Sequence, residues 1–316
     1  MYLIRDIHNI DLFNKRFSSE PLIATIGNFD GLHLGHKEII KKMKSIGAKD
    51  NLKTLVIFTE PHAAEYFSKI NNSSPPPRII PWRDKLRLIS ENGIDFCMLL
   101  RFDESLKSMT PEQFTEKILE ELQIKSLTIG DDFKFGKDRK GDYQFLKNWG
   151  ESMSIENDKT DPIKVNDQRV SSTRIREQLS KGNFEQAERM LGYKYRITGQ
   201  IISGKKIGRR IDTPTANIEI DNQEFCLNGV YLCKTKLNDE IFFSIVNFGP
   251  KPTFDDYNQS LEAHLLDFEG NLYNQSVCVE FLCKIRDQIK FASIDELKAQ
   301  INKDKKTVFE LIKSYE

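Results

Sequence analysis

Two histidines three positions apart lie in the segment of this chain that most clearly indicates chemistry. His33 and His36 follow the apolar run Leu22–Ile26 and a turn rich in glycine. A helix is predicted from about residue 37 to residue 46, so the turn meets a helix N-terminus, where backbone N–H groups attract anions. Imidazoles at this spacing project to one side of a helix. The pattern predicts a nucleotide site in which both rings bind phosphates and stabilise charge that develops during transfer.

A zinc site and a pair of surface histidines are the alternatives for this segment. His62, after the next predicted strand, supplies a third potential zinc ligand. However, no carboxylate stands at the usual spacing, and a turn bracketed by glycines suits phosphate better than metal. On the nucleotide interpretation, Asn28 and Asp30 organise the loop.

A second group of polar residues, from Ser171 to Arg176, precedes and opens a predicted helix. Ser171 or Ser172 is an ordinary helix N-cap, which is the structural interpretation. The functional one places hydroxyl and N–H groups on phosphates, with Arg176 one turn into the helix as a charge clamp. Nucleotidyl transfer needs positive charge on both sides of the triphosphate, so the two motifs support each other.

The turn from Gly130 to Gly136 has two interpretations that the residues leave open. It contains Asp132 and Phe133. It is either a plain glycine turn or the lining of an aromatic and polar pocket for a second, flat substrate.

The second half of the chain contains a basic, glycine-rich stretch from Gly204 to Arg210 that leads into Pro214-Thr215-Ala216-Asn217. Its structural interpretation is a solvated hairpin turn. Its functional one is a phosphate loop, with the Thr215 hydroxyl and the Asn217 amide oxygen as hard ligands for Mg²⁺. Glu262, in an alternating strand, is either a solvent-facing residue or a general base toward a substrate hydroxyl.

Strand-like and helical patterns alternate around these motifs in the first half. The predicted strands are Leu22–Ile26, Thr54–Phe58, Phe96–Leu100 and Leu127–Gly130, and the predicted helices are Lys37–Ile46, Arg83–Asn92 and Pro111–Leu122. Gly47 suits a stop of the first helix. The alternation predicts an α/β domain with a parallel sheet and helices on both faces. Ligands bind at the carboxyl ends of such strands, so the turns at Gly27, Glu60 and Gly130 should converge on one edge.

After Tyr195 the pattern changes to short alternating strands rich in Val, Ile, Phe and Tyr. They are predicted at Ile197–Ile202, Gly229–Lys236, Ile241–Val246, Leu261–Leu266 and Val277–Ile285. This texture predicts an antiparallel barrel or sandwich. Two short helices, Thr173–Leu179 and Asn183–Leu191, precede it. A final helix starts at Ile294, with Ser293 as N-cap and Glu296 completing a capping box.

Composition limits the class of protein. The chain has 316 residues, 39% of them hydrophobic and 30% charged, which indicates a globular protein of two domains. Its 47 basic and 47 acidic residues give zero net charge, which does not favour a nucleic acid as partner. No signal peptide and no apolar run of membrane-spanning length is visible. The five cysteines form no C-x-x-C pair and suggest core residues in a reducing cytoplasm.

Taken in order, the motifs resemble those of the bacterial bifunctional riboflavin kinase/FMN adenylyltransferase (FAD synthetase) family over about residues 22 to 312. The specific N-terminal motifs are Gly27-Asn28-Phe29-Asp30-Gly31, His33-x-Gly35-His36, Glu60-Pro61-His62, Gly130-Asp131-Asp132-Phe133-x-Phe135-Gly136 and Ser171-Ser172-Thr173-x-x-Arg176. The C-terminal motifs include Gly208-Arg209, Pro214-Thr215-Ala216-Asn217, Gly229-Val230-Tyr231, Pro252-Thr253-Phe254 and Glu262-x-His264-Leu265-Leu266-Asp267-Phe268.

The resemblance implies a Rossmann-like nucleotidyltransferase domain over residues 1–185, followed by a riboflavin kinase domain over residues 186–316. The second domain would be a six-stranded antiparallel β-barrel with a C-terminal helix. The implied ligands are ATP, riboflavin, FMN and FAD, with Mg²⁺ as the metal. The sequence leaves the oligomeric state open, including a homo-oligomer.

The resemblance also implies roles for individual residues. His33, His36, Arg176 and Glu262 would be catalytic. Nucleotide contacts would come from Gly27, Asn28, Phe29, Asp30, Gly35, Ser171, Ser172, Thr173, Gly204, Gly208, Arg209 and Pro214. His62, Asp132, Phe133 and Arg286 would contact the flavin, and Thr215 and Asn217 would hold the metal.

One departure from the family pattern motivates an alternative function. Pro214 is usually preceded by Gly-Phe in the family, but here it follows Asp212-Thr213. An acidic residue beside a phosphate loop adds like-charge repulsion, and a β-branched residue lacks the backbone freedom of glycine. The alternative is therefore an FMN adenylyltransferase with a degenerate, flavin-binding kinase domain. A flavin-sensing protein without turnover and a metal-dependent hydrolase are more distant alternatives.

Overall fold

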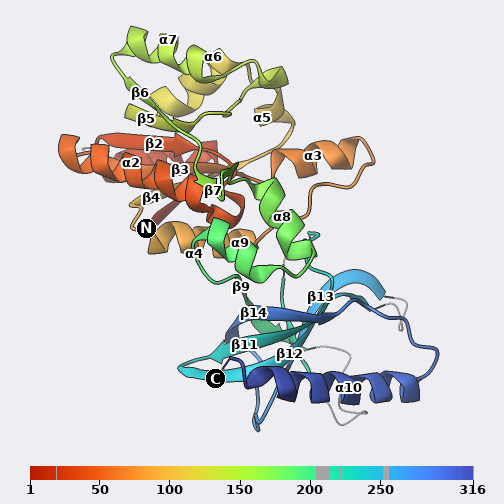
Figure 1. The fold of residues 1–316 in the computed structure, drawn as a ribbon. Helices are drawn as coiled ribbons and strands as arrows, with labels where there is room; N and C mark the ends of the chain where they lie inside the picture. The colour runs from red at the N-terminus through yellow and green to blue at the C-terminus, as the bar shows by residue number, and fades with distance from the viewer. Residues whose placement is uncertain (19, 204–213, 221–222, 252–255, 316) are drawn as a thin grey trace. The chain divides into compact units, whose positions relative to one another are not determined.

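The structure is a computed structural model that describes residues 1–18, 20–203, 214–220, 223–251 and 256–315. The chain folds into two compact units, each of which packs mainly within itself (Figure 1). The first comprises residues 1–76 and 85–171, and the second comprises residues 77–84 and 172–316. The sequence analysis places a boundary between the two functional domains after residue 185. It stays a prediction, because it concerns which activity each part of the chain carries.

A six-stranded parallel sheet forms the centre of the first unit, as predicted. Its strand order is β1-β4-β3-β2-β5-β6, and every neighbouring pair is parallel. The strands are β1 (Tyr2–Arg5), β2 (Leu22–Ile26), β3 (Lys53–Glu60), β4 (Phe96–Arg101), β5 (Ile124–Gly130) and β6 (Glu156–Thr160). The edge strands β1 and β6 were not predicted. The sequence of β6, Glu-Asn-Asp-Lys-Thr, lacks an apolar pattern because an edge strand need not be buried on both faces.

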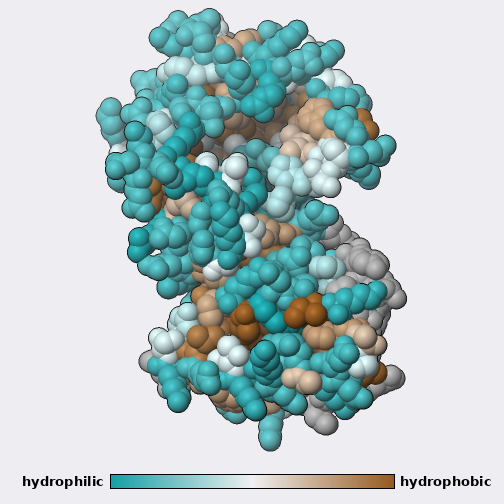
Figure 2. Space-filling model, turned by 45° about the vertical axis from the view of Figure 1, so that its right-hand side comes forward, coloured by the Kyte–Doolittle hydropathy of each residue, from teal (hydrophilic) through white to brown (hydrophobic). Residues whose placement is uncertain are grey.

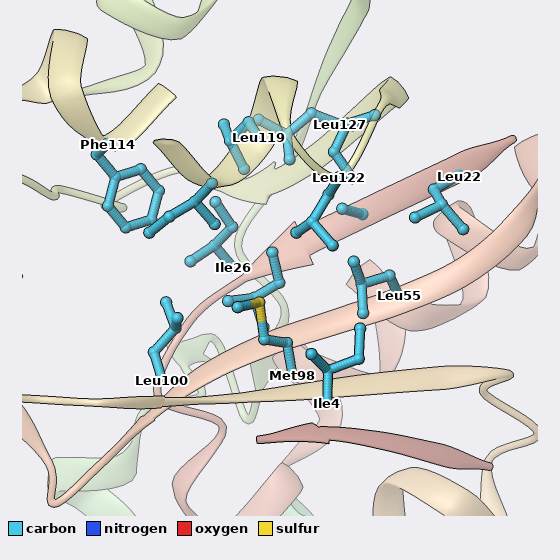
Figure 3. Packing of buried hydrophobic residues seen from close by; sticks show 14 of the residues in the cluster. Ile4, Leu22, Ile26, Leu55, Met98, Leu100, Phe114, Leu119, Leu122 and Leu127 are labelled. Carbon is cyan, nitrogen blue, oxygen red and sulfur yellow. The ribbon is translucent and has the colours of Figure 1, made fainter. Parts of the chain in front are cut away.

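Helices cover both faces of this sheet. They are α1 (Ile10–Phe17), α2 (Leu34–Asp50), α3 (Ala63–Ile70), α4 (Trp82–Glu91), α5 (Glu104–Ser108), α6 (Pro111–Phe114) and α7 (Tyr143–Met153), and a two-stranded hairpin consists of β7 (Lys164–Val165) and β8 (Gln168–Arg169). One face of the sheet packs against α1, α6 and α7 in a single hydrophobic cluster. Leu22, Leu55 and Phe114 belong to this cluster (Figure 3). On the other face, α2 approaches Ile23 so closely that a Cβ on Gly47 would lie 3.3 Å from its Cγ2 atom.

Two helices of the first unit differ from their predicted form. α2 runs past Gly47 to Asp50 and ends on Asn51, which adopts the left-handed conformation with φ 54°. Gly47 does not end the helix. A glycine is needed at this position because a side chain has no space: a Cβ would lie 2.9 Å from the Leu52 carbonyl oxygen. The segment predicted as one helix from residue 111 is α6 followed by a π-helical stretch, Thr115–Glu120.

The second unit contains a closed six-stranded antiparallel barrel, which decides between the barrel and the sandwich. Its order is β10-β13-β12-β11-β14-β9, closed by the pairing of β10 with β9. The strands are β9 (Arg196–Ile202), β10 (Ala216–Ile218), β11 (Gly229–Leu237), β12 (Glu240–Lys251), β13 (Asp256–Leu265) and β14 (Ser276–Arg286). Aromatic side chains fill the interior, where the Tyr231 and Phe281 rings meet edge to face at 5.4 Å.

The described residues of the second unit include the helices α8 (Ser172–Ser180), α9 (Phe184–Leu191) and α10 (Ile294–Ile312). Ser293 caps α10 as predicted, accepting a hydrogen bond from the Glu296 backbone N–H. Glu296 accepts from the Ala292 N–H rather than from Ser293, so the reciprocal half of the box is shifted by one residue. Asn183 occupies the N-cap position of α9, but its side chain donates to Gln178 instead of capping the helix.

A buried ion pair attaches α10 to the barrel. The Arg286 guanidinium on β14 contacts the Asp304 carboxylate with N–O distances of 2.8 and 3.0 Å, and Gln300 donates a further hydrogen bond to the same carboxylate. Only 5% of the Asp304 side chain is exposed. Leu232 on β11 and Val308 on α10 pack in the same interface.

No helix among the described residues is long and apolar enough to cross a membrane. Hydrophilic residues cover most of the face drawn in Figure 2, with apolar residues exposed in small patches.

Replacing Asp304 with Asn is expected to destabilise the barrel unit by about 3 kcal/mol, because the buried guanidinium would lose its charged partner. Urea denaturation followed by hydrogen exchange of barrel amides measures this loss. Glu310→Gln, an exposed position on the same helix, is the matched control. Equal stability of the two variants would show that the ion pair contributes little to the attachment of α10.

Candidate active sites

His33 is the N-cap of α2, so the helix begins two to three residues earlier than predicted. Its Nδ1 atom accepts a hydrogen bond from the His36 backbone N–H at 3.4 Å. The two imidazole rings stack with centroids 3.7 Å apart and planes 14° apart, which confirms that they project to one side. Since Nδ1 of His33 accepts, the proton of its neutral ring is on Nε2.

Glycines and a buried aromatic ring hold this pair in place. Phe29 is 1% exposed, adopts φ 50°, and its ring lies 5.1 Å from that of His36. A Cβ on Gly27 would lie 3.2 Å from the Phe29 ring, and one on Gly35 would lie 3.1 Å from Cε1 of His33. Both glycines therefore make room for rings. The Phe29 side chain supports His36 from inside, and a nucleotide contact of Phe29 stays a prediction.

The electrostatic environment of His36 favours its neutral form. Its Nδ1 atom is buried and has no hydrogen-bond partner among the described residues. Burial is the main cause that holds the pKa of His36 well below its ordinary value, and the neighbouring His33 and Lys85 lower it further. Lys85 is itself 3% exposed and lies over the Phe58 ring, 4.5 Å from the centroid. A bound phosphate would be attracted by this positive charge and would favour protonation of the ring.

The turn after β3 places His62 at the N-cap of α3. Its Nδ1 atom accepts from the Ala64 N–H at 3.1 Å, and Glu65 accepts from the His62 N–H at 3.0 Å. The capping box uses one ring nitrogen of His62, a role that the sequence did not indicate. Within the parts of the chain that the structure describes, no group of three His, Cys, Asp or Glu residues could hold a metal ion. The zinc alternative therefore has no ligand set there.

The turn after β5 is tied to the β7–β8 hairpin by an arginine that sequence analysis missed. Arg169 lies 2.7 Å from an Asp131 carboxylate oxygen and 3.0 Å from Asp132. Phe133 stacks on Phe135 with centroids 5.6 Å apart. The Asn166-Asp167 pair is a sequence signal for a tight hairpin turn before Arg169, and both residues have positive φ in the structure.

The strands β3, β2 and β5 are consecutive in the sheet. Their parallel carboxyl ends lie along one edge, so the turns at Gly27, Glu60 and Gly130 share that edge as predicted.

The Ser171–Arg176 motif spans the division between the two units. Ser171 ends the first unit, and Ser172 opens both the second unit and α8. Arg176 donates from Nε to the Pro77 carbonyl oxygen at 2.7 Å, a bond within the second unit that fixes the stem of its guanidinium.

The barrel places a second group of polar residues on its outer surface. Asn217 on β10 lies directly opposite Glu262 on β13, and Glu262 lies opposite Asn247 on β12. Directly opposed residues of antiparallel strands share a face. Their strand neighbours, such as Ala216 and Ala263, are buried in the barrel, so this row faces outward and is half-buried.

His264 and Arg286 have defined partners beside this row. The His264 Nδ1 atom lies 2.8 Å from the Pro214 carbonyl oxygen. Burial is the main cause that lowers the pKa of His264, and Lys305 adds to it, whereas the bond to Pro214 acts in the opposite direction. The guanidinium of Arg286, expected at the flavin, contacts Asp304, and a flavin contact stays a prediction. Gly204, Gly208, Arg209 and the Asp212-Thr213 pair lie outside the described residues.

Known proteins match the chain along almost its full length. A family model for FAD synthetase matches residues 15–174, and one for riboflavin kinase matches residues 191–312. A bifunctional riboflavin kinase/FMN adenylyltransferase from Haemophilus influenzae is 40% identical over 97% of this chain and 98% of that protein. The protein of the same description from Escherichia coli is 36% identical over 98% and 97% of the two chains. This chain belongs to the bifunctional riboflavin kinase/FMN adenylyltransferase family.

The fold of the whole chain is also found in a solved structure. A Streptococcus pneumoniae protein described as a macrolide-efflux protein superimposes with a TM-score of 0.76 at 26% identity, covering 98% of this chain and 99% of its own. That description applies to that protein. The histidine pair and the three sheet-edge turns fall within the FAD synthetase match, and the Asn217–Glu262 row falls within the riboflavin kinase match.

Replacing Lys85 with Met is expected to raise the pKa of His36, because a positive charge that disfavours the imidazolium is removed. The pKa should stay below its ordinary value, since burial remains the main cause. Titration of ¹⁵N-labelled histidines by NMR measures both shifts. Lys147→Met, at an exposed lysine of α7, is the control. An unchanged or lower pKa in Lys85→Met would contradict this electrostatic account.

Proposed function

We propose that this protein phosphorylates riboflavin to FMN and then adenylylates FMN to FAD, using ATP in both reactions. One observation carries this proposal: the chain holds two differently built sites, one in each family match. The stacked histidine pair at a helix N-terminus suits the triphosphate of a nucleotide. The Asn217–Glu262 row suits metal-bound ATP beside a base.

In the adenylylation, an oxygen of the FMN phosphate attacks the α-phosphorus of ATP. A new P–O bond forms there, and the bond to the bridging oxygen breaks as pyrophosphate leaves with the electron pair. His33 and His36 would hydrogen-bond the triphosphate and stabilise the charge that grows on the leaving group. Asn28 and Asp30 would shape the loop, and Ser172, Thr173 and Arg176 would hold further phosphate oxygens. His62, Asp132 and Phe133 remain the proposed flavin contacts.

In the kinase reaction, the 5′-hydroxyl of the ribityl chain attacks the γ-phosphorus of ATP, and ADP leaves. Glu262 would accept the hydroxyl proton as the O–P bond forms. The basic, glycine-rich stretch that contains Gly204, Gly208 and Arg209 would bind phosphates beside Pro214. Charge stabilisation is the main requirement of phosphoryl transfer.

The donor atoms of this site fit Mg²⁺. The Thr215 hydroxyl and the Asn217 amide oxygen are hard oxygen ligands, and Asn217 faces the carboxylate residue Glu262 across the strand pair. Bound Mg²⁺ would neutralise charge on the phosphates. Thr215 and Asn217 would orient the metal-bound nucleotide, and Glu262 would accept the proton.

A second candidate is an FMN adenylyltransferase whose barrel only binds flavin. The Asp212-Thr213 pair favours it, since these residues replace the family's Gly-Phe before Pro214. The facing positions of Asn217 and Glu262 favour the bifunctional enzyme. The functional boundary after residue 185, a cytoplasmic location and the preference for Mg²⁺ also stay predictions.

The deciding experiment is chromatography of the products after incubation of the pure protein with ATP, Mg²⁺ and either riboflavin or FMN. The bifunctional proposal requires FAD from both substrates. FAD from FMN alone would establish the adenylyltransferase alternative. If neither substrate gives product, both proposals fail.

Two variants should separate the two activities. His36→Ala is expected to slow FMN adenylylation about a hundredfold, or ~3 kcal/mol of transition-state stabilisation, and to spare riboflavin phosphorylation. Glu262→Gln should do the reverse, slowing the kinase about a hundredfold through loss of the base. Steady-state rates of both reactions on each variant test this. Loss of both activities in one variant would contradict the assignment of the two residues to separate sites.

A further inference from the structure

The N-terminal end of β10 is held by a side chain of a neighbouring strand. This strand is only Ala216–Ile218, pairing with β13 at all three positions and with β9 at Asn217 and Ile218. The residues just before it, Pro214 and Thr215, extend beyond the last backbone pair. Proline has no N–H, so it cannot donate to a strand ladder. The backbone ladder therefore cannot position this end through Pro214.

A side chain of the neighbouring strand instead contacts this end through the Pro214 carbonyl oxygen. His264 lies on β13 two residues beyond Glu262, and both are half-buried, whereas Leu261, Ala263 and Leu265 between and beside them face the barrel interior. The Nδ1 atom of His264 lies 2.8 Å from the Pro214 carbonyl oxygen. A carbonyl oxygen only accepts, so Nδ1 carries the proton and donates it.

This bond determines where the proposed metal ligands can lie. Thr215 stands between a carbonyl tied to His264 and a residue, Ala216, that is paired with Ala263. The backbone on both sides of Thr215 is therefore held by β13, the strand that also carries Glu262. Catalytic geometry tolerates little error, and an offset of about 1 Å can cost about a hundredfold in rate.

We propose that His264 is a positioning residue of the riboflavin kinase site, which holds the Pro214 carbonyl and thereby places Thr215 and Asn217 relative to Glu262. This inference rests on the proposed kinase activity. His264 itself neither contacts the reacting atoms nor transfers a proton. Its function requires one N–H donor at the position of Nδ1, and it requires no charge.

That requirement defines a pair of variants. In His264→Asn the side-chain amide can present an N–H near the position of Nδ1, whereas His264→Ala has no donor. We expect His264→Ala to raise the KM for ATP-Mg²⁺ in riboflavin phosphorylation roughly 3- to 10-fold, the size of one lost hydrogen bond, and to lower kcat as well. His264→Asn should restore most of both values. FMN adenylylation, measured on the same samples, should be unchanged.

A second measurement does not depend on activity. Hydrogen–deuterium exchange of the protein without nucleotide or metal should become faster in the peptide spanning residues 214–218 of His264→Ala, and stay close to wild type in His264→Asn. Lys236→Ala, an exposed position on β11, is the control in the same barrel. Thermal unfolding of each variant shows whether the barrel is still folded.

The results separate this inference from the proposed function. Wild-type protein without kinase activity would refute the function, while the exchange experiment would still report on the hydrogen bond. If His264→Asn and His264→Ala have the same KM, or if exchange at residues 214–218 does not change, His264 is not a positioning residue. A lower unfolding temperature with an unchanged KM would likewise show a purely structural role.

Discussion

The parallel pairing of β2 with β3 on one side and β5 on the other is the constraint on which the proposed nucleotide site depends. Parallel strands end at the same edge, so three turns that are distant in sequence are brought together there. All five residues of β2 are buried, so the strand is covered on both faces of the sheet, and its register with β3 is continuous from Leu22 to Ile26. The positions of His33, His62 and Asp132 all follow from that register.

The candidate functional residues of this edge also hold the backbone. His33 and His62 are both N-caps, each accepting a backbone N–H at the start of a helix. A capping side chain is held in one rotamer by the helix it caps, so the cap also fixes the orientation of the imidazole ring. The proposed ligand contacts and helix initiation would therefore depend on the same imidazole rings, and loss of a ring would affect both.

The barrel brings its candidate residues together through antiparallel strand pairing. The register of β10, β13 and β12 places Asn217, Glu262 and Asn247 in one row. This row lies on the outer surface because the aromatic core fills the interior. The shortest barrel strand among the described residues, β10, carries Asn217, one of the two proposed metal ligands. Its position therefore depends on contacts from β13, and the ion pair of Arg286 with Asp304 keeps α10 on the same barrel.

The sequence by itself determined the α/β class of the first domain, the antiparallel β class of the second, most strand and helix positions, and the two groups of candidate residues. It did so because periodicity, turn glycines and motif spacing are local properties of the chain. Only the tertiary structure decided that Gly47 is needed for space, that Arg169 pairs with Asp131, and that Arg286 is engaged by Asp304. These facts depend on which distant segments pack together. The bond from His264 to Pro214 belongs to the same class, since it joins residues 50 positions apart through a strand pairing that no local pattern encodes.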